Sequence, residues 1–134
     1  MGARIDTLML ADWAEAIDGK LYVMGGGFTA LRLRDFDRPH RCFLAAILRV
    51  PAADAGRPIP VAAHLETSAG ARLEGWSLRG ELSTEPSLGR ADGAEGVAVL
   101  AGPVDLDVPG ATQVVLHFDF GDDNRKLSLD VLNM

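Results

Sequence analysis

Apolar and polar residues alternate along most of the chain, with the two-residue period of a half-buried β-strand. The clearest case is the C-terminal third, where two alternating segments flank the polar tetrad 121–124. Their apolar residues are Val114, Leu116, Phe118 and Phe120 before the tetrad and Leu127, Leu129 and Val131 after it. Two such segments around a turn rich in Gly, Asp and Asn predict a β-hairpin.

Folding this hairpin about residues 121–124 also predicts its register. On the apolar face the expected pairs are Phe118 with Leu127, Leu116 with Leu129 and Val114 with Val131; on the other face they are Asp119 with Lys126 and His117 with Ser128. A slip by one residue would turn the apolar side of one arm to water, so the alternation constrains the pairing.

Further strands are expected at residues 4–11, 20–24, 28–31, 42–50, 59–67, 72–83 and 96–108, the last broken at Gly102-Pro103. Residues 12–17 are expected to form one short helical turn, because Asp12 and Glu15 have the spacing of a capping box. Glycines 25–27 interrupt the second strand and predict a bulge or a close backbone approach, with Gly26 at positive φ. Residues 84–94 are polar and rich in Gly and Pro, which predicts a mobile loop.

Segment 42–50 differs from the others because it is apolar at nearly every position. Such a run, bounded by Pro39 and Pro51, predicts a strand that is buried on both faces. In a two-layer structure the outward face of that strand needs a cover. The cover is expected from the 12–17 turn with its Trp13, or from a second subunit.

Seven to nine short strands with evenly spaced turns indicate an all-β protein. We expect an immunoglobulin-like antiparallel β-sandwich in a single domain spanning residues 1–134, with a barrel as the alternative. With 48% apolar residues, the chain can build one core without disulfides or a structural metal.

The single cysteine, Cys42, excludes an intrachain disulfide and fits a reducing compartment. No run approaches the ~20 apolar residues that cross a bilayer, and we find no export signal. Asp6 stands where an N-myristoylation site needs Ser or Thr. We therefore expect a cytoplasmic protein without a membrane partner.

Charge is unevenly distributed. Residues 1–91 contain eleven acids and eleven bases, whereas residues 92–134 contain eight acids and two bases and account for the net charge of −6. This balance argues against a nucleic-acid partner, because duplex binding needs a positive surface.

Residues 10–14, Leu-Ala-Asp-Trp-Ala, and residues 18–28, Asp-Gly-Lys-Leu-Tyr-Val-Met-Gly-Gly-Gly-Phe, form a distinctive opening. It resembles that of an uncharacterised family of small bacterial proteins, with A-D-x-A, then D-G-K-L, then a glycine pair or triplet before an aromatic residue. The likeness continues through the apolar strand after Pro39 and the Pro109-Gly110 turn, although Thr112 stands where an aromatic residue is common. The resemblance implies an all-β sandwich with no established activity, and it transfers no catalytic residues.

Two glycine-containing segments resemble known functional motifs but lack a feature that each motif requires. A phosphate cradle at residues 25–27 would need a following helix with a Lys-Ser or Lys-Thr pair, but the strand pattern resumes at Phe28. The segment 75–80 places its second glycine three residues after Ser77, where a nucleophile elbow requires two.

Two sets of residues resemble nucleophilic sites. His117, Asp119 and Ser128 share one face of the predicted hairpin, but His117 and Asp119 would lie about 7 Å apart along a strand. His40 and Cys42 also share a strand face. A cysteine at the start of so apolar a strand is more often a buried hydrophobic residue than a nucleophile.

Charged residues suggest two further sites. Calcium prefers oxygen ligands of the kind found at Asp119, Asp122 and Asp123, with Asp105 and Asp107 as further donors, but Asp is also common in hairpin turns. The basic residues near the middle of the chain, with their neighbours, are Arg32, Arg34, Arg38 and Arg41 with Phe36 and His40. Asp35 and Asp37 lower that local charge, and a solvated connection explains the segment better than nucleic-acid binding.

No residue is therefore assigned as catalytic, cofactor-binding or metal-ligating, and no cofactor is expected. The leading hypothesis is a non-catalytic β-sandwich module that forms a homodimer or binds a protein partner. A small-ligand or metal-ion binding protein, using the glycine triplet or the acidic hairpin end, is the second. An enzyme is the third, because no catalytic set is assembled by the sequence.

Overall fold

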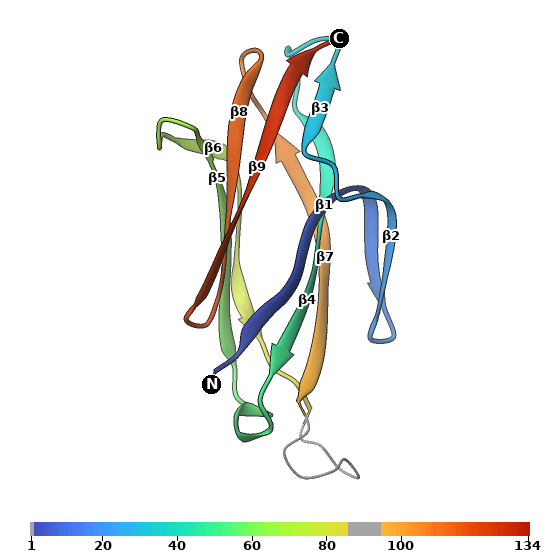
Figure 1. Ribbon diagram of the computed structural model, residues 1–134, viewed down its shortest axis with the longest axis vertical. Helices are drawn as coiled ribbons and strands as arrows, with labels where there is room; N and C mark the ends of the chain where they lie inside the picture. Colours follow the sequence, from blue (N-terminus) through green and yellow to red (C-terminus); the bar gives the residue numbers. More distant parts are fainter. Residues whose placement is uncertain (1, 86–94) are drawn as a thin grey trace.

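The computed structural model describes residues 2–85 and 95–134, which form two facing β-sheets (Figure 1). The strands in these ranges are β1 (Arg4–Ile17), β2 (Lys20–Gly26), β3 (Ala30–Leu33), β4 (His40–Val50), β5 (Ile59–Thr67), β6 (Arg72–Leu82), β7 (Gly96–Leu106), β8 (Thr112–Phe120) and β9 (Asp123–Asn133). Their order is β2-β1-β4-β7 in one sheet and β3-β9-β8-β5-β6 in the other. The predicted β-sandwich is confirmed, because the two sheets stay separate and do not close into a barrel.

The core lies between the sheets and is built by the alternation that the sequence displays. On β8, Leu116, Phe118 and Phe120 point inward, and on β4, Leu44 and Leu48 do the same; each is at most 1% exposed. Burial of a large apolar side chain stabilises a fold by roughly 1.5–3 kcal/mol. The inward faces of β4 and β8 are therefore a main source of stability.

The C-terminal hairpin forms as predicted, but its register differs by two residues. Its turn is Gly121 with Asp122, because Phe120 already pairs with Asp123 and Gly121 has a φ of 58°. Leu116 consequently faces Leu127 instead of Leu129. A shift of two preserves the face of every side chain, so the predicted apolar and polar sides are correct although the individual pairs are wrong.

The helical turn predicted for residues 12–17 is wrong, because these residues continue β1. Ile17 pairs with Lys20 around a two-residue turn, in which Asp18 and Gly19 have φ values of 52° and 72°. Such a turn matches the twist of a tight hairpin. Pairing with β2 satisfies the backbone of this segment and overrides the local capping pattern of Asp12 and Glu15.

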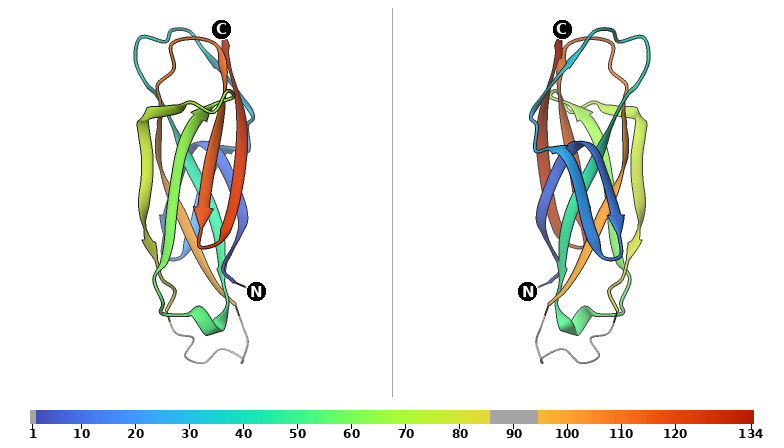
Figure 2. Two further views of the ribbon diagram at one scale, coloured as in Figure 1. Left: turned by 90° about the vertical axis from the view of Figure 1, so that its left-hand side faces the viewer. Right: turned by 90° about the vertical axis from the view of Figure 1, so that its right-hand side faces the viewer.

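The second half of β1 and all of β2 form a hairpin, hereafter the β1–β2 hairpin, that folds back over its own sheet. Figure 2 shows it, in the right-hand view, in front of β4 and β7. Ala14 of the hairpin packs with Ala11 and Ala45, and Leu21 and Val23 contact the same cluster. The outward face of β4 is therefore covered at Ala45, and the cover comes from Ala14 and β2 of the same chain. Trp13, which was expected to supply the cover, lies on the opposite face of the hairpin and is exposed.

The glycine triplet allows this close packing. A Cβ atom at Gly25 would lie 2.3 Å from Oδ2 of Asp12, and one at Gly26 would lie 2.6 Å from Cγ1 of Val23. The predicted close approach is thus confirmed, but positive φ is found at Gly25 and Gly27 instead of Gly26. Beyond Gly27 the chain does not resume the same strand. It crosses to the other sheet, where β3 pairs in parallel with β9.

The remaining strands lie close to their predicted places. β7 runs through Gly102-Pro103 without the expected break, and Pro103 pairs with Phe43. β7 is an edge strand, where proline is tolerated because one side of the backbone has no strand partner. The loop predicted for residues 84–94 lies outside the described residues except for Thr84 and Glu85.

Candidate functional site

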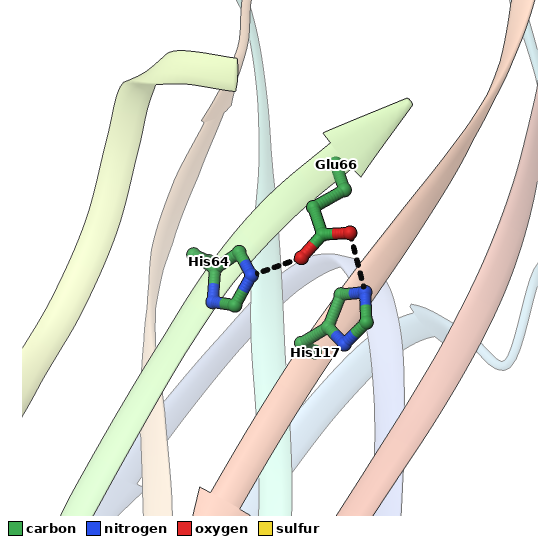
Figure 3. A group of neighbouring side chains, drawn as sticks. All are labelled: His64, Glu66 and His117. Carbon is green, nitrogen blue, oxygen red and sulfur yellow. Dashed lines mark hydrogen bonds and ion pairs between the residues drawn. The ribbon is translucent and has the colours of Figure 1, made fainter. Parts of the chain in front are cut away.

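Two histidines and a glutamate meet on the outer face of the five-stranded sheet. His64 and Glu66 are two positions apart on β5, so both point away from the core, while Ala63 and Leu65 are buried. His117 on β8 is the direct cross-strand partner of His64. We call His64, Glu66 and His117 the His–Glu cluster (Figure 3).

Both imidazoles of the cluster aim one nitrogen at the same carboxylate. Nε2 of His64 lies 2.6 Å from Oε2 of Glu66, and Nε2 of His117 lies 3.3 Å from Oε1. The two rings are stacked, with centroids 4.8 Å apart and planes 1° from parallel. The three side chains are 21–24% exposed, so the cluster is half-buried and accessible from solvent.

The carboxylate of Glu66 is held in its ionised form. The hydrogen bond from His64 is the largest influence and lowers the pKa of Glu66 below its usual range, although partial burial opposes the shift. The charges of His117 and of Lys126 lower it further. Lys126 lies on β9 directly opposite His117. The cluster therefore presents a carboxylate anion between two imidazoles at neutral pH.

These residue types are suited to holding a metal ion. One ligand atom from each of the three residues lies within 4.8 Å of the others, and within residues 2–85 and 95–134 this is the one such group of His, Cys, Asp or Glu. A nucleophilic role finds less support. In the same ranges neither imidazole is hydrogen-bonded to a hydroxyl or a thiol, which a nucleophile–base pair requires.

A second surface lies on the β1–β2 hairpin, on the side that faces away from the sheet. Trp13 pairs with Met24, and Ile17 pairs with Lys20, on the same face as Tyr22. Trp13, Ile17, Tyr22 and Met24 are 37%, 43%, 46% and 65% exposed. We call these four side chains, with the neighbouring Glu15 and Lys20, the hairpin face.

Comparison with known protein families gives a match over most of the chain. A model described as a family of unknown function (DUF6941) matches residues 6–132. The chain belongs to this family. A search of curated proteins found no match to the sequence.

Membership of DUF6941 confirms the resemblance to an uncharacterised family that the opening of the chain suggests. It supplies no activity, so the residues themselves must indicate the function. In the parts of this DUF6941 protein that the structure describes, no helix is long and apolar enough to cross a membrane.

The structure does not assemble the serine–histidine–carboxylate set considered from the sequence. Ser128 pairs with Val115, and the residue opposite His117 on β9 is Lys126. Asp119 accepts a hydrogen bond of 2.7 Å from Nδ2 of Asn124. The partners of His117 come instead from β5, a strand that the sequence analysis did not connect to it.

The acidic residues considered for calcium are also dispersed. Asp123 accepts a hydrogen bond of 2.7 Å from the backbone N–H of Ile5. Asp105 pairs with Arg41 near the end of β7, away from the β8–β9 turn (Figure 1). A calcium ion needs six to eight converging oxygen ligands, whereas Asp105, Asp119 and Asp123 each contact a different partner.

Cys42 is a core residue of this DUF6941 protein. It is 2% exposed, and burial raises the pKa of its thiol to about 11, so the thiolate needed for nucleophilic chemistry is suppressed. His40 lies at the first position of β4. In the basic segment around it, Arg41 is paired with Asp105, and Nε of Arg34 donates a hydrogen bond to Sδ of Met134.

The remaining motifs have structural explanations. Residues 75–80 run through the middle of β6, and Ser77 is simply the cross-strand partner of His64. Trp76 donates a hydrogen bond of 2.9 Å from Nε1 to the carbonyl of Pro103 and so ties β6 to β7 across the two sheets. The glycine triplet allows close packing in the β1–β2 hairpin, and after it the chain crosses to the other sheet, where β3 follows without a helix.

Sequence reasoning missed His64 and Glu66. Their i, i+2 spacing on an alternating strand places them on one face, and this was readable in the sequence. The contact with His117 was not readable, because it depends on β5 pairing with β8. No local pattern specifies which strands of a sandwich become neighbours.

Proposed function

We propose that this DUF6941 protein is a non-catalytic β-sandwich module that forms a homodimer through the hairpin face. The proposal rests on one observation: four large apolar side chains lie on the outer side of the β1–β2 hairpin, whose inner side covers β4. Their neighbours on the other side of the same strands, Ala14, Leu21 and Val23, pack inward. The hairpin therefore has one face for the fold and one face left for a partner.

The composition of the hairpin face suits recognition. Trp, Tyr and Met are enriched where proteins contact one another. Trp and Tyr offer large contact areas at a low loss of side-chain freedom. A run of exposed large apolar side chains rimmed by polar residues often marks such a contact. Lys20 lies at one end of this face, and Glu15 lies within it, opposite Tyr22.

A second copy of the chain is the partner that this face fits best. A two-fold contact needs a surface complementary to itself. The hairpin face carries one acid, Glu15, and one base, Lys20, which allows opposite charges to meet across a two-fold axis. β2 is also an edge strand, and two copies of an edge strand can pair in antiparallel fashion. The face is small, so we expect a weak dimer below the ~1,200 Å² of standard interfaces.

Within residues 2–85 and 95–134, the nucleophile–base sets that the sequence suggests are not assembled, which favours a non-catalytic role. The sets Ser128 with His117, and Cys42 with His40, are either separated or buried in the fold. We further propose a cytoplasmic location, which the unpaired Cys42 supports.

We also propose that the sandwich is immunoglobulin-like. β4 pairs with β7 in one sheet, and β9, β8, β5 and β6 follow in that order in the other. In immunoglobulin domains strand B pairs with E, and strands G, F, C and C′ follow one another in the facing sheet. The chain order β4 to β9 then runs B, C, C′, E, F, G. The β1–β2 hairpin is the addition that distinguishes this protein.

Sedimentation velocity over a dilution series tests the proposed dimer. We expect a monomer–dimer equilibrium in the micromolar range, and we expect the double substitution of Trp13→Ser and Tyr22→Ser to abolish the dimer. Met134→Ser is the matched control, because Met134 is 70% exposed but lies after β9 on the other sheet. A wild-type protein that stays monomeric up to about 200 μM would contradict the proposal, as would a dimer that survives the double substitution.

A further inference from the structure

We infer that the His–Glu cluster is a binding site for a divalent transition-metal ion of the zinc type. The site lies on the sheet opposite to the hairpin face, so it does not depend on the proposed dimer. Its donor set is the first ground. Two imidazole nitrogens and one carboxylate oxygen are the ligands that zinc takes in many proteins. Calcium and magnesium prefer oxygen ligands alone, and the two histidines exclude them as the best fit.

The spacing of the donor atoms is the second ground. Two ligands of a tetrahedral zinc ion lie about 3.4 Å apart, given metal–ligand distances near 2.1 Å. The carboxylate oxygens of Glu66 lie 2.6 Å from Nε2 of His64 and 3.3 Å from Nε2 of His117. All three ligand atoms can be chosen within 4.8 Å of one another. An imidazole binds a metal in its own ring plane, and the two ring planes are 1° from parallel, so the rings must turn toward one another to share an ion.

The backbone beneath the cluster is fixed. β5 lies between β6 and β8, and β8 lies between β5 and β9, so both strands that carry ligands are interior strands of the sheet. The alternate residues of these strands, including Leu65 and Leu116, are anchored in the core. Half-buried side chains on a rigid platform can exclude part of the bulk water while an ion still has access from outside.

The expected affinity is moderate. Three protein ligands leave a fourth position for water or for a ligand from another molecule, unlike the closed four-ligand shell of structural zinc sites. In the described ranges neither histidine has a second hydrogen-bond partner to orient its other nitrogen. Lys126 adds a positive charge beside His117, which opposes a cation. We therefore expect a micromolar site that exchanges its ion.

Isothermal titration with zinc chloride tests the site. The protein must carry no histidine tag and must first be dialysed against a chelator. We expect one zinc ion per chain. Removing even an outer-shell partner of a metal typically weakens binding by about 10–100-fold, so His64→Gln and His117→Gln should each weaken it at least as much. His40→Gln is the matched control, because His40 is the remaining histidine and lies on β4 of the other sheet.

Each outcome of this titration decides the matter. Loss of binding in both cluster variants, with binding retained in His40→Gln, supports the site. Absence of zinc binding, or equal binding in all three variants, overturns it. Binding of calcium chloride with equal affinity also overturns it, because an imidazole pair does not favour calcium.

Two further measurements separate a metal site from a simple histidine–glutamate ion pair. Lys126→Gln removes the opposing charge, so zinc should bind at the same strength or a few-fold more tightly; weaker binding would contradict the placement of the ion.

The melting temperature without zinc should be nearly the same in wild type and in His117→Gln, because the side chain is partly exposed. Zinc should then raise the melting temperature of wild type only. An equal rise in both proteins would overturn the site.

Discussion

The outer faces of the two sheets differ, because one is covered by the β1–β2 hairpin and the other is accessible to solvent. On the four-stranded sheet, the outward residue Ala45 is completely buried beneath the β1–β2 hairpin. On the five-stranded sheet, the outward residues His64 and His117 stay accessible and carry titratable groups. One face is a second small core, and the other is an open surface with an assembled cluster.

This difference is already encoded in the strand patterns. β4 is apolar at both odd and even positions, which is stable only if both of its faces are covered. β5 and β8 alternate, so their outward positions are free to hold polar groups without any loss of core packing. An interior strand with one solvated face is thus the place where a sandwich can carry chemistry.

The contrast between the covered and the open outer face is tested most strongly by placing a charge on each face in turn. Ala45→Glu should destabilise the protein by about 3–5 kcal/mol, because a carboxylate would be buried without a partner under the hairpin. The matched change on the open face, Ala62→Glu, should alter stability by less than about 0.5 kcal/mol. There the new side chain lies between Arg79 and Asp119, whose charges oppose each other.

Urea denaturation of the two variants measures this contrast directly. A loss in Ala45→Glu no larger than that in Ala62→Glu would mean that the hairpin does not cover β4 in solution.

The pH dependence of stability tests how completely the interior buries the Cys42 thiol. Burial raises the pKa of its thiol from 9.0 to about 11 in the folded protein. Below pH 9 the thiol is protonated in both states and contributes its full stability. Between pH 9 and 11 the unfolded chain ionises first, so the free energy of unfolding falls, by at most roughly 3 kcal/mol.

The control is Cys42→Ala, which lacks the thiol but keeps every other group that titrates in alkali. Its stability relative to wild type should improve as the pH rises from 9 to 11. A constant difference across that range would show that the thiol is not desolvated.

The glycines beneath the hairpin give a smaller effect. A Cβ atom at Gly26 would lie 2.6 Å from Cγ1 of Val23 and 2.7 Å from Sδ of Met9. Gly26→Val should therefore cost about 1–3 kcal/mol through overpacking. Gly80→Val on β6 should be neutral, because a Cβ atom at Gly80 meets nothing within 4 Å. Melting curves of the two variants compare them, and an unchanged curve for Gly26→Val would contradict the close packing of the hairpin.

Much of the fold was predictable from the sequence because the period of alternation specifies both strands and faces. Phe118 and Phe120 were placed correctly in the core, although the predicted partner of Phe118 on β9 was displaced by two residues. That displacement arose because residues 121–124 all favour turns, and only the positive φ of Gly121 shortens the loop. The 12–17 segment failed for another reason: Asp12 and Glu15 fit a helix start locally, but the Asp18-Gly19 turn and β2 impose a strand.

The candidate site was less accessible to sequence reasoning. His117 was recognised as an outward residue, yet its neighbours were sought along its own hairpin. The true neighbours, His64 and Glu66, lie on β5, far away in the chain. The alternation shows which face a residue occupies, whereas strand order in the sheet decides which residues meet on that face. The same limit hid the hairpin face, since it appears only once residues 12–17 are recognised as a strand.

Our central claim is that the two outer sides of the molecule have separate roles, with a dimer contact on the hairpin face and a metal on the His–Glu cluster. Native mass spectrometry with added zinc tests both roles at once. The wild type should appear as a dimer with one zinc ion per chain. His117→Gln should lose the zinc but keep the dimer, and Trp13→Ser with Tyr22→Ser should lose the dimer but keep the zinc. A wild type without dimer or zinc, or a substitution that removes both properties together, would contradict the claim.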